Sequence, residues 1–178
     1  MMLEIVWDKA DCTLTLGDIS IVAAPRSNPP FSYQAIVEEQ DTHLILGEQQ
    51  GLTDPGKPAW YLANTLDMVK PYELGTVVVK GHSPHHLLAV VHDVEQTPTL
   101  SPESVTQAYQ TVLQIRQSMQ LTSLAMPLLG TVHGHLSEHE SLQRLRECLL
   151  QGPTAGLQRL WLILPTDSDC HCLGDLSS

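Results

Sequence analysis

A strand–loop–helix signature over residues 124–140 constrains the fold of this chain more than any other feature of its sequence. Residues 124–127 are typical of a short buried strand that ends at a proline, and glycines bound the loop at 130–134, which we name the glycine loop. Ser137 then opens a helix capping box. Glycines allow close approach to the backbone, and a helix N-terminus favours negative charge. The unit therefore predicts a backbone site for an anion such as a phosphate.

The elements on either side of this unit predict an α/β domain with a mostly parallel sheet. Aliphatic and β-branched residues indicate strands over residues 76–79, 87–91, 123–128 and 160–164. Caps at Ser101 and Ser137, each followed by apolar residues three or four apart, indicate helices that end near Met119 and Gly152. Two strand–helix–strand connections require parallel strands, and such sheets bind ligands beyond the carboxyl ends of their strands. The glycine loop is expected at such an end.

The first half of the chain is expected to be less regular. We expect a strand over residues 3–7, a longer extended stretch over 13–23 and a break over 25–30. A short helix is expected over 32–40, followed by a strand or the end of that helix over 43–46. A loop over 47–58 and a helix over 60–69 complete this half of the chain. The length of 178 residues suits one domain, which we place over residues 1–166. The polar end, residues 167–178, is expected to be a flexible tail.

Charge and composition exclude two classes of partner. The 20 acidic and 9 basic residues give a formal net charge of −11, and Lys and Arg do not cluster, so no nucleic-acid interface is expected. No apolar run approaches the ~20 residues that span a bilayer, and the N-terminus does not have the pattern of a signal peptide. We therefore expect a cytoplasmic protein with reduced cysteines, with Cys148 in a helix core and Cys170 and Cys172 in the tail.

In this context the chain resembles the macro-domain family. The segment over residues 122–134 looks like the family's strand that ends in Pro and leads into Gly-Thr-Gly-x-x-Gly. Ala108-Tyr109 resembles the family's Ala-Tyr helix, Val90-Val-His92 its strand that ends near a histidine, and residues 75–79 the strand before that. The resemblance implies a three-layer α/β/α fold with a mixed, mostly parallel central sheet, and ADP-ribose as the class of ligand.

The resemblance extends to the N-terminal strands. Residues 18–24 look like the family's Asp-Ala-Ile-Val-Asn-Ala-Ala strand, which implies that Ala24 lies at the ligand and that Asp8 faces the adenine. A second register instead puts Asp18 on the family's Gly-Asp-Ile-Thr; we favour the first, because it keeps the Ala-Ala pair aligned. Either carboxylate would accept a hydrogen bond from the exocyclic amine.

Departures from the family pattern bear on catalysis. Where hydrolytic relatives have Asn, this chain has Val22 and Pro25, and residues 26–31 replace the glycine-rich segment. Val132 replaces the second glycine of the loop, and its Cβ limits positive φ and crowds a close phosphate. We therefore expect binding rather than hydrolysis.

The expected ligand site is the glycine loop, with the amides of residues 131–134 and the Thr131 hydroxyl as donors. Its predicted residues are Asp8, Asp18, Ala24, Gly130, Thr131, Val132, His133 and Gly134. The alternative is a tight strand-to-helix turn without a ligand, which Glu138 and Glu140 favour because acidic side chains in the first helical turn repel a phosphate. His133, His135 and His139 are not spaced as metal ligands, so we predict no metal, no cofactor and no catalytic residue.

Three functions remain open at this stage. The leading one is a binding module for ADP-ribose or a related nucleotide diphosphate. The second is an ADP-ribosyl hydrolase or phosphoesterase that uses Asn28, His133 or His135. The third is a ligand-free scaffold that associates with a protein partner or with itself.

Overall fold

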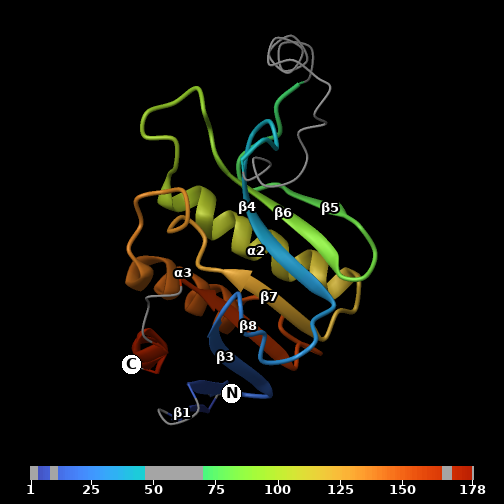
Figure 1. Ribbon diagram of the computed structural model, residues 1–178, viewed down its shortest axis with the longest axis vertical. Coiled ribbons are helices and arrows are strands. Elements are labelled where there is room, and N and C mark those ends of the chain that lie inside the picture. Colours follow the sequence, from blue (N-terminus) through green and yellow to red (C-terminus); the bar gives the residue numbers. More distant parts are fainter. Residues whose placement is uncertain (1–3, 9–11, 47–69, 166–169, 178) are drawn as a thin grey trace.

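A computed structural model describes residues 4–8, 12–46, 70–165 and 170–177 (Figure 1). Its strands are β1 (Ile5–Asp8), β2 (Thr13–Leu16), β3 (Ile19–Pro25), β4 (Ala35–Asp41), β5 (Val77–Lys80), β6 (His85–His92), β7 (Ser123–Pro127) and β8 (Arg159–Leu164). Its helices are α2 (Pro102–Ser118), α3 (Glu138–Gln151) and the 3-10 helix η2 (Cys170–Leu176). The strands form one 8-stranded sheet in the order β1-β2-β3-β8-β7-β4-β6-β5.

The centre of the sheet is parallel, as predicted. β3, β8, β7, β4 and β6 run parallel to their neighbours, whereas β1, β2 and β5 add antiparallel pairs on the two sides. The mixed, mostly parallel central sheet that we predicted is thus confirmed.

Local signals placed the two long helices correctly. The Ser101 hydroxyl accepts a hydrogen bond from Ser104 N at the start of α2, and Ser137 and Glu140 form the predicted capping box of α3. Both helices lie on the same face of the sheet (Figure 1), where Val105 and Leu145 are fully buried in the main core. A helix cap depends on residues that are close together in the sequence, so the sequence alone could predict both caps.

The connection between β3 and β4 packs on a second, smaller core. Phe31 and Tyr33 of this connection lie against Ile36 and Trp161, and the Trp161 indole N–H donates to Ala24 O at 2.9 Å. In the described part of the chain, this cluster is covered by the connection rather than by a helix.

Two local expectations about the region around β4 are wrong. Residues 32–40 are not a helix, because the run that begins at Ala35 pairs with β6 on one side and with β7 on the other. Residues 43–46 are not a strand, because Asp41 Oδ1 accepts hydrogen bonds from His43 N at 2.7 Å and Ile45 N at 3.5 Å and so holds a turn.

The expected single stretch over residues 13–23 is in fact a hairpin. Leu16 pairs with Ile19 across a two-residue turn, and Gly17 there has a φ of 59°. A glycine at the first turn position favours this reversal. The loop expected over 47–58 and the helix expected over 60–69 lie outside the described residues.

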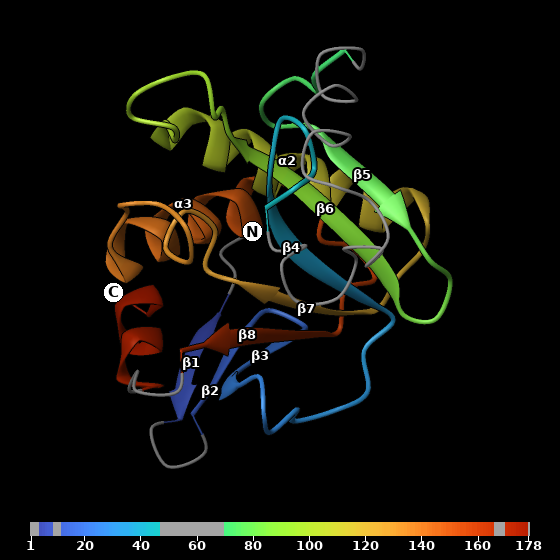
Figure 2. The ribbon, with the colours of Figure 1, turned by 45° about the horizontal axis from the view of Figure 1, so that its top comes forward.

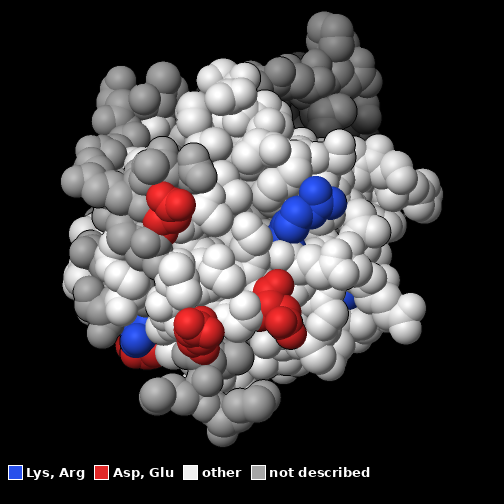
Figure 3. All heavy atoms as spheres, turned by 90° about the horizontal axis from the view of Figure 1, so that it is seen from below, with Lys and Arg blue, Asp and Glu red and all other residues white. Residues whose placement is uncertain are grey.

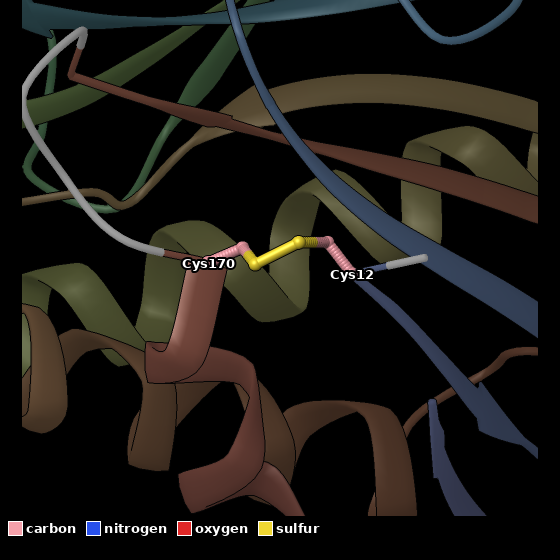
Figure 4. The surroundings of a disulfide bond; sticks show 2 residues. All are labelled: Cys12 and Cys170. Atoms are coloured by element: carbon pink, nitrogen blue, oxygen red, sulfur yellow. A yellow bond between two sulfur atoms is a disulfide. The ribbon is translucent and has the colours of Figure 1, made fainter. Parts of the chain in front are cut away.

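The described C-terminal residues, 170–177, differ from the flexible tail that we expected over residues 167–178. η2 packs against α3, its Leu173 is fully buried in the main core, and Cys170 forms a disulfide with Cys12 (Figure 4). The expectation that all cysteines are reduced is therefore wrong in this structure. Cys148 is buried on α3 as predicted.

None of the helices in the described ranges combines the length and the hydropathy that crossing a membrane requires.

Candidate functional site

The sheet has a topological switch point between β4 and β7. The chain leaves β4 towards β5 and β6 on one side and leaves β7 through α3 towards β8 on the other. The two strands pair at Ala35–Leu124 and Ile36–Ala125, and their ribbons then splay apart (Figure 2). In open α/β sheets, ligands bind outside the carboxyl ends of strands at such a point. The glycine loop follows β7 at this position.

The entry to the glycine loop is held by a closed set of buried hydrogen bonds. Leu129 N donates to the Tyr109 hydroxyl at 2.8 Å, and Ser141 Oγ donates to Leu129 O at 2.7 Å. The hydroxyls of Tyr109 and Ser141 are themselves 2.7 Å apart. Burial raises the pKa of Tyr109 well above its usual range, so the phenol stays protonated and donates to Ser141. Both helices thus fix the backbone just before Gly130.

The two glycines that bound the loop are required by its backbone. Gly130 has a φ of +86°, and a Cβ there would lie 2.7 Å from Leu136 Cδ1. A Cβ on Gly134 would lie 2.4 Å from Gly130 O. The tight turn alone explains both residues, as the structural alternative of the sequence analysis proposed.

A buried carboxylate accepts hydrogen bonds from two of the N–H groups of the loop. Glu39 Oε2 accepts from Gly130 N at 2.9 Å, and Oε1 accepts from His133 N at 3.2 Å. Oε1 also pairs with Nε2 of His92, and the two side chains are only 2% and 3% exposed. A buried charge needs paired donors, and these three supply them. In this structure, two N–H groups of the loop therefore hold an acidic side chain of the protein itself.

The His92 imidazole is held from both ring nitrogens. Its Nδ1 lies 3.2 Å from Thr99 Oγ1, while Nε2 faces Glu39. In the tautomer that donates Nε2–H to the carboxylate, Nδ1 accepts a hydrogen bond from the Thr99 hydroxyl. Hydroxyl, imidazole and carboxylate stand in the order of a hydrolytic triad, although no spacing in the sequence predicted one.

The Thr131 donors that we expected to face a ligand are engaged within the loop. Thr131 N and Thr131 Oγ1 both donate to Leu128 O, at 3.2 Å and 2.7 Å. The role of the Thr131 hydroxyl as a ligand donor stays a prediction, and in this structure the hydroxyl bonds to the loop's own backbone. Val132 is 54% exposed, and among the described residues neither its N–H nor that of Gly134 has a partner.

Of the predicted N-terminal site residues, the structure brings only Ala24 near the loop. Ala24 and Pro127 are both level with Ile163, so they lie at the same edge of the sheet on either side of β8. Asp8 is on the outer strand, with three strands between it and β7. Asp18 lies in the hairpin turn at the amino end of β3, at the opposite edge. The register that places Asp18 at a ligand is therefore not supported.

The histidines in and after the glycine loop are exposed, and Glu140 belongs to the cap of α3. His133, His135 and His139 are exposed, and no group of three or more His, Cys, Asp or Glu in the described ranges is arranged to hold a metal. Glu140 accepts from Ser137 N at 2.9 Å, and this hydrogen bond is the main cause that lowers its pKa. The Glu140 carboxylate thus accepts a hydrogen bond within the capping box of α3.

Sequence reasoning missed Glu39 and Thr99. The available signal was Glu39 two residues after Val37: in a strand these positions share a face, so an apolar face here carries an acid. An acid on a buried face is a candidate site residue.

Charged side chains do not gather by sign on the face shown in Figure 3. Lys and Arg stand singly among Asp and Glu over the part of the surface that is described. Together with the net charge of −11, this view offers no basic stripe for a nucleic-acid backbone.

The fold is that of the macrodomains. A mutant of the Oceanobacillus iheyensis macrodomain is similar with a TM-score of 0.64 and 16% identity, covering 99% of this chain and 96% of that one. A second mutant of the same protein, solved with ADPR, has a TM-score of 0.64 and 17% identity, with coverage of 96% and 94%. The macrodomain of Thermus aquaticus DarG has a TM-score of 0.60 and 18% identity, with coverage of 83% and 99%. No family model matches the sequence, and no curated protein matches it.

Proposed function

We propose that the chain is a binding module that recognises ADP-ribose or a related nucleotide diphosphate at the glycine loop. The observation that carries this proposal is the pair of N–H groups on Gly130 and His133, which hold the two oxygens of a carboxylate at 2.9 and 3.2 Å. Two N–H donors that bind both oxygens of a carboxylate can equally bind two oxygens of a phosphate. Their position at the switch point of the sheet is the usual place for a ligand.

The similar structures support the choice of ligand class. The Oceanobacillus iheyensis macrodomain was solved with ADPR and, in another structure, with ADP. Both molecules carry a diphosphate, which is the group that backbone N–H donors recognise. For this chain, ADP-ribose is therefore the first ligand to measure and ADP the second.

Hydrolysis is the second candidate, favoured by the His92 ring between Thr99 and Glu39. We rank it below binding, because Glu39 is also engaged by two loop amides and because Val22 within β3 and Pro25 at its end have apolar side chains. Release of ADP-ribose from a modified protein by a stoichiometric amount of this chain would promote it. No release at that ratio would remove it.

Binding is tested by titration calorimetry and thermal shift with ADP-ribose and ADP. Val132→Asp places a negative charge on the exposed side of the loop and is expected to abolish binding without unfolding the protein. Val79→Asp is the matched control, because Val79 is 41% exposed on β5 and far from the loop in the sheet order. No heat and no shift at millimolar ligand, or equal loss in both variants, would contradict the proposal.

A further inference from the structure

We infer that Glu39 is a built-in competitor for the anion position, so that a phosphate binds the glycine loop only after the Glu39 carboxylate has left it. This inference rests on the proposed function and adds to it the residue that sets the affinity. Glu39 would act as an autoinhibitory contact within the site.

The contact geometry excludes simultaneous occupancy. Both Glu39 oxygens are used, one on Gly130 N and one on His133 N, and Gly130 itself is buried. A second anion at these donors would face a carboxylate at hydrogen-bond distance from the same hydrogens. Like charges at that separation repel strongly inside a protein. An incoming phosphate must therefore replace the carboxylate rather than join it.

The partners of Glu39 have independent support, so the carboxylate can leave without taking them apart. Leu129, just before the loop donors, is held by Tyr109 and Ser141 from the helices. His92 keeps its hydrogen bond to Thr99, which does not involve Glu39. The loop would thus present the same N–H groups to a new anion.

The end of β4 has features of a ligand-facing strand. Its pairing with β6 shifts register between Gln40 and Asp41, and such bulges are frequent next to sites because they redirect side chains. Just after Glu39, three oxygens on residues at least nine-tenths buried have no hydrogen-bond partner within the described part of the chain: Gln40 Oε1, Asp41 Oδ2 and Thr42 Oγ1. Buried oxygens without partners are rare in native proteins. Two of them are pure acceptors, which hydroxyl groups such as those of a ribose would satisfy.

A competitor inside the site makes the loop free in only a fraction of the molecules. The apparent Kd for ADP-ribose is then the intrinsic Kd divided by that fraction. Glu39→Gln removes the charge, and its amide group cannot accept from all three donors. We expect this variant to bind ADP-ribose about tenfold more tightly than the wild type. The same variant should unfold at a lower temperature, since Gly130, His133 and His92 lose a charged acceptor.

The opposite signs of the two changes separate a competitor from a merely structural residue, which would lower stability and affinity together. Glu38→Gln is the matched control: it removes the same charge one position away, on a side chain that is 33% exposed and lies 3.4 Å from His86. It should leave the affinity unchanged. Equal or weaker ADP-ribose binding by Glu39→Gln would overturn the inference.

A second probe does not depend on ADP-ribose. In Glu39→Ala the loop donors lose their anion, and acetate should raise the melting temperature of this variant in a saturable way but leave Glu38→Ala unchanged. Acetate rescue without ADP-ribose binding by any variant supports the anion position and refutes the proposed function. Wild-type binding with no gain in Glu39→Gln and no acetate rescue supports the function and refutes the competitor.

If Glu39→Ala does not fold, a crystal structure of the wild type with ADP-ribose decides. Glu39 away from Gly130 N, with a phosphate in its place, supports the inference. Glu39 still bonded to that N–H while the ligand is bound refutes it.

Discussion

The hydroxyl of Tyr109 on α2 lies 2.7 Å from Ser141 Oγ on α3, and each of the two groups also bonds one backbone atom of Leu129. Two helices and the end of β7 therefore meet in one closed set of hydrogen bonds. These hydrogen bonds hold the backbone of Leu129, the residue just before the glycine loop.

Tyr109→Phe is expected to lower the free energy of unfolding by about 1–3 kcal/mol, because Leu129 N loses its acceptor in a fully buried place. Denaturant unfolding measures the loss, and hydrogen exchange at Leu129 should become faster than in the wild type. Tyr72→Phe, on a side chain that is 40% exposed, should change neither quantity. Equal stability of the two variants would show that the network contributes little.

The disulfide between Cys12 and Cys170 links the start of the β2–β3 hairpin to η2 (Figure 4). It closes a loop with a sequence separation of 158 residues, so its removal frees much chain entropy in the unfolded state. Cys170→Ser should cost about 2–4 kcal/mol of stability in oxidised protein. Cys172→Ser, two residues away, is the control. If dithiothreitol leaves the wild-type unfolding midpoint in place, the bond contributes nothing.

The Cys148 thiol predicts a pH dependence. Burial raises its pKa from 9.0 to about 11. Above pH 9 the unfolded chain loses this proton while the folded chain keeps it, so the contribution to stability is full below that pH and falls between about pH 9 and 11. The difference in unfolding free energy between wild type and Cys148→Ala should shrink over this range. A difference that stays constant from pH 8 to pH 11 would contradict the raised pKa.

How far the sequence could predict this molecule depends on how local each feature is. The caps at Ser101 and Ser137 lie within three residues of the groups they bond, and both helix starts were found. β4 was missed because the acid and amide run after Val37 is typical of a helix, and only pairing with two distant strands makes it extended.

The position of the glycine loop was predicted, but the contacts of its N–H groups were not. The glycine loop was correctly expected at a strand end, because the order of elements fixes that position. The direction of its N–H groups depends on Glu39, which is 91 residues from Gly130 and 53 from His92. No local pattern reports such a contact. The pairing of Cys12 with Cys170 is equally non-local, since spacing alone does not give disulfide connectivity.

Gly134 separates the structural from the ligand-related explanation of the loop. Gly134→Ala would set a Cβ 2.4 Å from Gly130 O, a backbone atom that cannot move without disturbing the donor to Glu39. We expect a loss of about 1–3 kcal/mol in the absence of any ligand, within the range of overpacked sites. Val132→Ala, on an exposed side chain of the same loop, should stay within about 0.5 kcal/mol of the wild type. Should Gly134→Ala keep full stability and lose only ADP-ribose binding, this glycine would serve the ligand rather than the turn.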